Sequence, residues 1–264
     1  MQDWNPALYL RFADERARPA AELLARVPLI QARRVADLGC GPGNSTALLL
    51  QRFAGAQATG VDNSRAMLAQ ARRQLPQAGF VLADMAGWEP AANERPDLIF
   101  ANASLQWAAD HEVLFPRLFS CLAPGGVLAV QMPDNLGEPV HRLVREVAAL
   151  PQYASHIGAD AAQARTALLP AAAYYDLLAA PAMAAASVDV WHTIYQQPLA
   201  SPAAIVQWVR GAGIKPFVDA LPTALQAPFL AEYERRIDAA YPARTDGTRL
   251  LAFPRIFIVA QRKP

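Results

Sequence analysis

Residues 35–45 read Val35-Ala36-Asp37-Leu38-Gly39-Cys40-Gly41-Pro42-Gly43-Asn44-Ser45. The pattern predicts an apolar strand that runs into a glycine-rich turn and then opens a helix. Glycines suit such a turn because side chains would block a ligand from approaching the backbone, and because tight turns need positive φ. The start of a helix also offers N–H groups and the positive end of the helix dipole. The pattern therefore indicates a ligand-binding loop, and a merely structural β–α turn is the alternative.

Two kinds of ligand compete for this loop. A dinucleotide loop has the spacing G-x-G-x-x-G, and its glycines contact a pyrophosphate. Here the third glycine, Gly43, comes one residue early, and the acidic Asp37 precedes the turn by two positions. An anion beside a pyrophosphate is unfavourable, whereas an anion beside the ammonium group of an amino acid is favourable. The loop therefore favours S-adenosylmethionine and speaks against a Rossmann oxidoreductase. A non-catalytic nucleotide-binding module is a further alternative.

Short apolar runs alternate with amphipathic segments along the first half of the chain. This alternation predicts a parallel α/β sheet with helices on both faces and right-handed crossovers. The predicted strands are 34–38, 58–61, 80–83, 97–101, 127–131, 188–195 and 255–260, and the predicted helical segments are 6–28, 44–53, 64–75, 112–122, 137–183 and 201–240. We expect one domain over residues 1–264. Its parts are a cofactor-binding core at 30–135, a helical cover at about 136–186 and 199–252, and last strands at 187–196 and 254–262.

The composition excludes several classes of protein. Of the 264 residues, 53% are hydrophobic and 18% are charged, which is enough apolar content for a buried core. The net charge of +1 gives no basic footprint for a nucleic acid, so we expect a small-molecule partner. Two cysteines, Cys40 and Cys121, are too few for a metal site or a disulfide framework. The sequence lacks a signal peptide and a membrane span, which predicts a cytoplasmic protein; it does not determine the oligomeric state.

Polar residues end the predicted strands at the edge where the glycine turn lies. Asp62 ends the second strand, where a carboxylate accepts hydrogen bonds from both hydroxyls of a ribose; a turn-forming role is the alternative. Asp84 and Met85 end the third strand and suit the amine and the ring face of an adenine. Because ligands bind at the carboxyl ends of parallel strands, these positions converge with Asn102 and Ala103 on one crevice. The predicted cofactor-binding residues are Asp37, Gly39, Cys40, Gly41, Asn44, Asp62, Asn63, Met67, Asp84, Met85, Asn102 and Ala103.

As a set, these motifs resemble the class I S-adenosylmethionine-dependent methyltransferases. The resemblance covers roughly residues 30–132. It rests on the strand-end acids, on Asp37-Leu38-Gly39-Cys40-Gly41-Pro42-Gly43 and on Pro124-Gly125-Gly126. It implies a Rossmann-like sheet of seven strands, mostly parallel with one antiparallel strand.

A narrower resemblance extends over nearly the whole chain. The chain resembles the trans-aconitate 2-methyltransferase family, which makes monomethyl esters of small tricarboxylic acids. The motifs that carry this resemblance are Trp4-Asn5-Pro6, Asp14-Glu15-Arg16, Gly43-Asn44-Ser45-Thr46, Phe100-Ala101-Asn102-Ala103, Gln106-Trp107, Asp110-His111, Tyr174-Tyr175, Trp191, Trp208, Pro216-Phe217 and Phe253-Pro254-Arg255. Asn63 stands where Ser is frequent, and residues 209–215 depart from the pattern, which leaves the acid open. Methylation of a carrier-bound acid or of a natural-product hydroxyl is the alternative within the same fold.

A carboxylate acceptor determines what the substrate side must supply. The carboxylate is ionised at neutral pH and attacks the sulfonium methyl unaided, so we expect no general base. None of the four histidines has metal-ligand spacing to another, so we expect no metal. Catalysis then rests on proximity and on donors that hold the acid.

Gln106 and Trp107 follow the fourth strand, where the methyl group should lie. In the fold that the resemblance implies, the sixth strand ends beside the start of the antiparallel seventh, which pairs Tyr195 with Arg255. A solvated surface charge is the alternative for Arg255. The predicted substrate-binding residues are Gln106, Trp107, Trp191, Tyr195 and Arg255.

Overall fold

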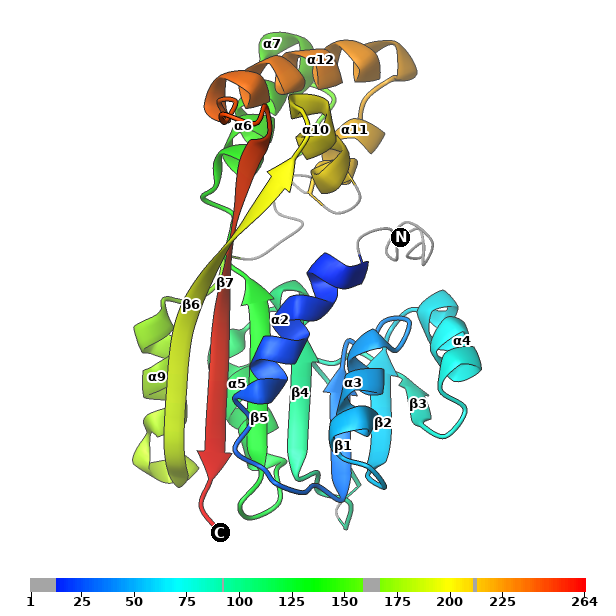
Figure 1. Ribbon diagram of the computed structural model, residues 1–264, viewed down its shortest axis with the longest axis vertical. Helices are drawn as coiled ribbons and strands as arrows, with labels where there is room; N and C mark the ends of the chain where they lie inside the picture. Colours follow the sequence, from blue (N-terminus) through cyan, green and yellow to red (C-terminus); the bar gives the residue numbers. More distant parts are fainter. Residues whose placement is uncertain (1–12, 92, 159–166, 211–212) are drawn as a thin grey trace. The chain divides into compact units, whose positions relative to one another are not determined.

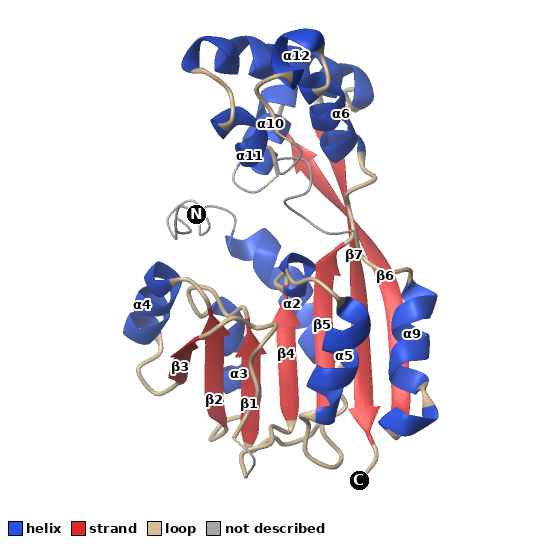
Figure 2. Cartoon of the chain, turned by 180° about the vertical axis from the view of Figure 1, so that it is seen from behind, coloured by secondary structure: helices blue, strands red, loops and turns tan. Residues whose placement is uncertain are grey.

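The computed structural model describes residues 13–91, 93–158, 167–210 and 213–264 (Figure 1). Within these ranges the strands form a seven-stranded sheet in the order β3-β2-β1-β4-β5-β7-β6. Its strands are β1 (Arg34–Leu38), β2 (Gln57–Asp62), β3 (Gly79–Leu82), β4 (Leu98–Asn102), β5 (Val127–Pro133), β6 (Ala185–Leu199) and β7 (Arg249–Arg262). The pairs β1–β2, β1–β4, β2–β3 and β4–β5 are parallel, and β7 runs opposite to the other strands (Figures 1 and 2). The predicted fold class is confirmed.

Helices lie on both faces of the sheet. Figures 1 and 2 show α2 (Ala13–Ala25) and α3 (Asn44–Arg52) on one face, and α5 (His111–Ser120) and α9 (Ala171–Ala179) on the other. The central strands β4 and β5 are almost fully buried between these layers, as expected of parallel strands that are covered twice. The remaining helical elements are α4 (Arg65–Gln74), η1 (Leu105–Trp107), α6 (Pro139–Ala148), α7 (Pro151–Ala154), η2 (Pro181–Met183), α10 (Pro202–Arg210), α11 (Lys215–Asp219) and α12 (Thr223–Ala240).

The expected single domain contains two compact units, each with its own core. The sheet unit comprises Met1–Met132, Leu168–His192 and Ile256–Pro264, and the helical unit comprises Pro133–Ala167 and Thr193–Arg255. In the sheet unit the core joins buried strand residues to the inner sides of α5 and α9. In the helical unit the core is formed by the apolar sides of α6, α10 and α12. β6 and β7 contribute residues to both units.

Several element boundaries differ from the predicted ones. β6 and β7 are longer than the predicted strands, since each continues into the helical unit. The predicted helical cover at 136–186 is divided, because α9 belongs to the sheet unit and packs on α5. The reason is the spacing of Tyr174 and Leu178, which are four residues apart and both fully buried. The part of the helix 6–28 that precedes residue 13 lies outside the described residues, as does Trp4-Asn5-Pro6. No helix in the described ranges is long and apolar enough to cross a bilayer.

Candidate functional site

The glycine turn follows β1 in left-handed backbone conformations. Gly39 has φ of 69° and Gly41 has φ of 54°. A Cβ atom on Gly39 would lie 2.2 Å from the Cβ atom of Ser104, so only glycine fits there. A Cβ atom on Gly41 would meet no described atom within 4 Å. The turn is therefore packed tightly at its start and open at its second glycine.

The N–H groups of the turn already have acceptors. Gly39 N and Cys40 N donate to the carbonyl of Val61 at 2.7 and 3.1 Å, and Gly41 N donates to Asp62 Oδ2 at 2.9 Å. A pyrophosphate needs such N–H groups for itself and is repelled by a carboxylate. The geometry therefore agrees with the conclusion, drawn from the glycine spacing, that this loop does not suit a dinucleotide.

Asp37, in β1, is a buried carboxylate with one oxygen engaged. Its Oδ2 accepts hydrogen bonds from Ser45 Oγ at 2.7 Å and from Thr46 Oγ1 at 2.6 Å, which ties the strand to the start of α3. Its Oδ1 is buried and accepts no hydrogen bond from the described residues. Burial raises the pKa of Asp37 to about 6, although the bonds from Thr46 and Ser45 oppose the rise. An ordered cation beside Oδ1 would stabilise the ionised form.

Asp62, at the end of β2, is held by the backbone. Its Oδ2 accepts from Gly41 N, and its Oδ1 accepts from Ser64 N at 2.8 Å. Ser64 in turn caps α4, because its Oγ accepts from Met67 N at 3.2 Å. These bonds fix the direction of the Asp62 carboxylate, and its contact with the hydroxyls of a ribose stays a prediction.

The other predicted cofactor residues of these elements differ in exposure. Cys40 and Met67 are each 3% exposed, and burial raises the pKa of the Cys40 thiol. Cys40 Sγ lies 2.8 Å from where a Cβ atom on Gly60 would stand, so the thiol packs over β2. Asn63 is exposed, and Asn44, which begins α3, is half-buried. Contact of these four residues with a cofactor stays a prediction.

The loop after β3 carries Asp84 and Met85. Asp84 is exposed, and its Oδ1 accepts from Ala86 N at 2.9 Å, which is a turn-forming role. Met85 Cε lies 3.5 Å from where a Cβ atom on Gly39 would stand, so the structure brings this side chain to the glycine turn. Arg117 of α5 fixes the loop by donating to the carbonyls of Trp88 and Ala86 at 2.7 and 2.6 Å. Sequence reasoning missed Arg117, whose acceptors are backbone atoms about 30 residues away.

The end of β4 holds further buried acceptors. Ala103 has φ of 53°, and its N–H group donates to the carbonyl of Gln131 on β5 at 2.9 Å. Gln106 is 4% exposed, and its Nε2 donates to the carbonyl of Ala103 at 2.8 Å. Asn102 Oδ1 and Gln106 Oε1 are buried and accept no hydrogen bond from the part of the chain that the structure describes.

These observations test whether S-adenosylmethionine fits the residues present. Asp37 Oδ1, Asn102 Oδ1 and Gln106 Oε1 are acceptors that lack donors among the described residues, and they belong to the carboxyl ends of two adjacent strands or directly follow them. A buried acceptor without a donor costs roughly 1–3 kcal/mol, so such acceptors call for a ligand that brings donors or positive charge. S-adenosylmethionine carries an ammonium group and a sulfonium. These three acceptors therefore fit this cofactor.

The predicted substrate residues fall into both units. Trp107 is 40% exposed. Trp191, in the sheet unit, stacks on Phe257 with ring centroids 4.9 Å apart, and Arg26 lies 5.4 Å from its ring, so the indole has a packing role there. Its contact with a substrate stays a prediction.

Tyr195 and Arg255 belong to the helical unit and lie together. The Arg255 guanidinium is 6.0 Å from the ring centroid of Tyr195 and 4.7 Å from that of Phe253. Arg255 is 7% exposed, so the alternative of a solvated surface charge is wrong. A buried guanidinium between aromatic rings is well placed to bind an anion in a fork, but that role stays a prediction.

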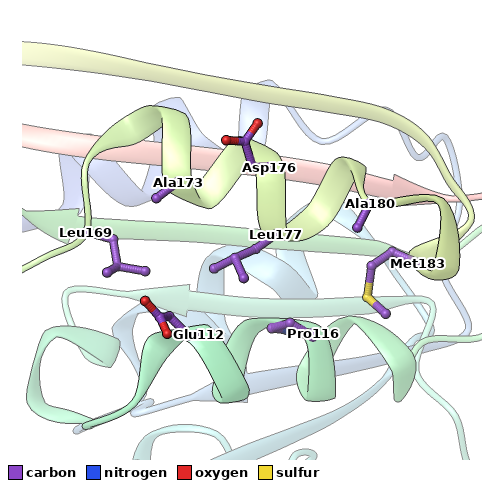
Figure 3. A pocket seen from close by; sticks show the side chains of 8 residues that line it. All are labelled: Glu112, Pro116, Leu169, Ala173, Asp176, Leu177, Ala180 and Met183. Atoms are coloured by element: carbon purple, nitrogen blue, oxygen red, sulfur yellow. The ribbon is translucent and has the colours of Figure 1, made fainter.

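A groove of about 470 Å³ lies between α5 and α9 and contains none of these residues (Figure 3). Glu112 and Pro116 of α5 face Ala173, Asp176, Leu177 and Ala180 of α9 across it. It is mostly apolar and separate from the residues predicted to bind the cofactor and the acid.

Comparison with a solved structure shows the fold. The YcgJ protein of Bacillus subtilis matches with a TM-score of 0.61 at 13% identity, over 94% of this chain and 99% of that one. A family model described as a methyltransferase domain matches residues 35–126, which contain the glycine turn and the strand-end residues.

Comparison of sequences shows the family. The chain is 68% identical over 269 residues to the trans-aconitate 2-methyltransferase of Delftia acidovorans and 67% identical over 263 residues to that of Variovorax paradoxus. Each alignment covers 100% of both chains. The chain therefore belongs to the trans-aconitate 2-methyltransferase family.

Proposed function

We propose that this chain transfers a methyl group from S-adenosylmethionine to one carboxylate of trans-aconitate and forms the monomethyl ester. The observation that carries the proposal is full-length identity of 67–68% to two proteins that bear the name of this activity. The acceptor-rich ends of β1 and β4 support it independently, because they suit a cationic methyl donor.

The cofactor supplies an electrophilic methyl group on a sulfonium. On this proposal, Asp62 accepts the ribose hydroxyls, Asp37 faces the ammonium group, and Met85 packs on the adenine. Neighbouring residues already fix both carboxylates. Such fixed acceptors lower the cost of ordering a ligand.

The acid acts as its own nucleophile. A carboxylate is ionised at neutral pH, so no proton has to be removed before its oxygen attacks the methyl carbon. The protein then has to align the two reactants and hold the remaining carboxylates, which proximity and fixed donors accomplish. We assign the holding role to Arg255 and Tyr195, and we place Gln106 and Trp107 beside the reacting groups.

The proposal is tested by a methyl-transfer assay over a panel of di- and tricarboxylic acids, with products identified by mass. We expect trans-aconitate to gain one methyl group in an ester that mild alkali removes. Methylation of no acid, together with tight binding of S-adenosylhomocysteine, would show that the acceptor is another molecule. Absence of that binding would overturn the cofactor assignment as well.

The small acid is the partner that this function requires. The net charge of +1 gives no reason to add a nucleic acid to it. The cytoplasmic location expected from the sequence stays a prediction.

A further inference from the structure

The segment after β4 that carries Gln106 and Trp107 cannot fix its own geometry. η1 is a single 3-10 turn of three residues, Leu105–Trp107, and such turns have poor hydrogen bonds and no helical cooperativity. Ala103, just before it, is left-handed with φ of 53°, which is unfavourable for a residue with a side chain. Neighbouring elements must therefore hold this segment in place.

His111, the first residue of α5, provides one such hold. Its Nε2 lies 2.9 Å from the carbonyl oxygen of Leu105. A carbonyl only accepts hydrogen bonds, so Nε2 carries the proton and donates. The same oxygen accepts from Ala108 N at 2.9 Å, so both of its lone pairs are used. The imidazole is 8% exposed, and little water competes for this bond.

Tyr174 of α9 orients the imidazole. Its hydroxyl oxygen lies 2.6 Å from His111 Nδ1. In the neutral imidazole with its proton on Nε2, Nδ1 accepts and the Tyr174 hydroxyl donates. The hydroxyl accepts in turn from Leu169 N at 3.3 Å. Phe115 packs against both rings: its ring centroid lies 5.3 Å from the ring centroid of His111 and 4.7 Å from that of Tyr174. The hydrogen bonds thus run in series from Leu169 N through Tyr174 and His111 to the carbonyl of Leu105.

Gln106, which follows Leu105, indicates what this series of hydrogen bonds achieves. Gln106 is more than nine-tenths buried, and its Oε1 accepts no hydrogen bond among the residues that the structure describes. A buried amide oxygen is costly unless a ligand supplies a donor or a polarised C–H group. Its placement therefore matters for binding or reaction, and it depends on the η1 backbone that His111 holds.

We infer that His111, oriented by Tyr174, is a positioning residue for methyl transfer that sets the geometry of Gln106 and Trp107. The inference rests on the proposed function, since it takes the segment after β4 to lie beside the reacting groups. His111 does not serve as a base: both of its ring nitrogens are engaged, and a carboxylate acceptor needs none. Its contribution is alignment, and a misplacement of about 1 Å can cost on the order of 100-fold in rate.

Four variants test the inference. Tyr174→Phe removes one buried oxygen and keeps the ring, and His111→Leu removes both hydrogen bonds. His111→Gln restores an amide N–H that can reach the Leu105 carbonyl but cannot act as a base. Tyr233→Phe is the matched control, because Tyr233 is equally buried and donates to the carbonyl of Val140 at 2.7 Å within the helical unit.

We expect Tyr174→Phe and His111→Leu to lower kcat by roughly tenfold or more at unchanged affinity for S-adenosylhomocysteine, and His111→Gln to recover part of the loss. Tyr233→Phe should keep kcat within about twofold of wild type, although its unfolding temperature falls as much as that of Tyr174→Phe. Equal kcat in Tyr174→Phe and Tyr233→Phe would overturn the inference, as would a folded His111→Gln no faster than His111→Leu.

The proposed function and this inference fail separately. The proposed function is judged on wild type alone, and the variants are compared on whichever acceptor wild type methylates. Hydrogen exchange gives a readout that needs no activity: the amides of residues 104–108 should exchange faster in Tyr174→Phe than in Tyr233→Phe or wild type. Equal exchange in all three would show that the pair does not hold η1.

Discussion

Asp62 is held by the backbone before any ligand arrives. Gly41 N and Ser64 N fix its two oxygens, so Asp62→Ala removes a fixed acceptor, which we propose binds the ribose. We expect the variant to bind S-adenosylhomocysteine more weakly by roughly 1–3 kcal/mol, because hydrogen bonds to a charged acceptor are lost. Isothermal titration calorimetry measures this change directly.

Asp97 provides the control for that experiment. Its Oδ2 accepts from Arg33 N and Arg34 N at 2.6 and 3.0 Å, so it is also a carboxylate held by two backbone donors, but at the other end of β1. Asp97→Ala should lower the unfolding temperature and leave the affinity for S-adenosylhomocysteine unchanged. Equal loss of affinity in both variants would mean that Asp62 acts only through the stability of the fold.

We expect the raised pKa of Asp37 to make cofactor binding depend on pH. Its pKa is raised from 3.8 to about 6, so without a ligand the ionised carboxylate destabilises the fold above pH 6, and this cost disappears as the pH falls through about 6 toward 4. A ligand ammonium group needs the ionised form. Affinity for S-adenosylhomocysteine should therefore fall as the pH drops below about 6, by up to about tenfold per pH unit.

Calorimetry between about pH 5 and 7.5 checks this expectation. Asp37→Asn keeps an oxygen for Ser45 and Thr46 but carries no charge, so it should bind weakly at every pH and lose the slope. A wild-type affinity that stays constant over this range would contradict the proposed contact with the ammonium group.

Residues were predictable from the sequence where a local pattern constrained them. Asp37 and Asp62 stand at fixed distances from the glycine turn, and the structure shows both carboxylates held at that turn. Arg117 was not singled out from the sequence, and His111 was quoted there only as part of a motif, because each acts on a backbone carbonyl of another element. No spacing in the chain reveals such a partner.

The turn between β1 and α3 needs glycine for the stability of the fold. Gly39→Ala would place a Cβ atom 2.2 Å from Ser104 Cβ, at a backbone φ of 69° that alanine disfavours. The clash and the conformational cost together should destabilise the protein by about 2–4 kcal/mol. Urea unfolding measures this loss.

Gly55→Ala separates these two costs. Gly55 also has positive φ, 87°, but a Cβ atom there would meet no described atom within 4 Å. This variant should lose only about 1 kcal/mol, which is the conformational part. If both variants lose the same stability, contact with Ser104 is not what requires Gly39.

Elements were predictable where periodicity and turns agreed. The alternation of strands and helices through β5 gave boundaries within a few residues, because each buried strand is a short apolar run between turn residues. α9 was predicted as part of the helical cover, whereas it belongs to the sheet unit. An alanine-rich helix has little polarity to show which of its faces is buried. The full length of β6 was missed, because half of its residues are exposed and its pattern is that of an edge strand.

At the scale of the whole molecule, the candidate residues divide between the two compact units. The predicted cofactor-binding residues all belong to the sheet unit, whereas Tyr195 and Arg255 belong to the helical unit. The other predicted substrate residues, Gln106, Trp107 and Trp191, belong to the sheet unit. The two units were not predicted from the sequence, since unit boundaries fall inside β6 and β7, where no linker composition marks them.

Arg255, in the helical unit, is proposed to hold the acid, and its substitution tests that role. A planar guanidinium binds a carboxylate with two parallel hydrogen bonds, so Arg255→Ala should raise KM for the acid by roughly 10- to 100-fold. Affinity for S-adenosylhomocysteine should hardly change, because the proposed role of Arg255 is to hold the acid. Arg255→Lys should recover only part of the loss, since an ammonium group cannot reproduce the fork.

Steady-state kinetics on these variants and on Arg249→Ala decide the matter. Arg249 is the matched control: it is a partly buried arginine of the same strand that pairs with Asp238 at 2.7 Å, and no role in binding the acid is assigned to it. Its removal should cost stability without raising KM. If Arg255→Ala and Arg249→Ala leave KM equally unchanged, the Arg255 guanidinium does not hold the acid. If Arg255→Ala instead loses affinity for S-adenosylhomocysteine, its charge acts on the cofactor, and the acid must be held by other cations.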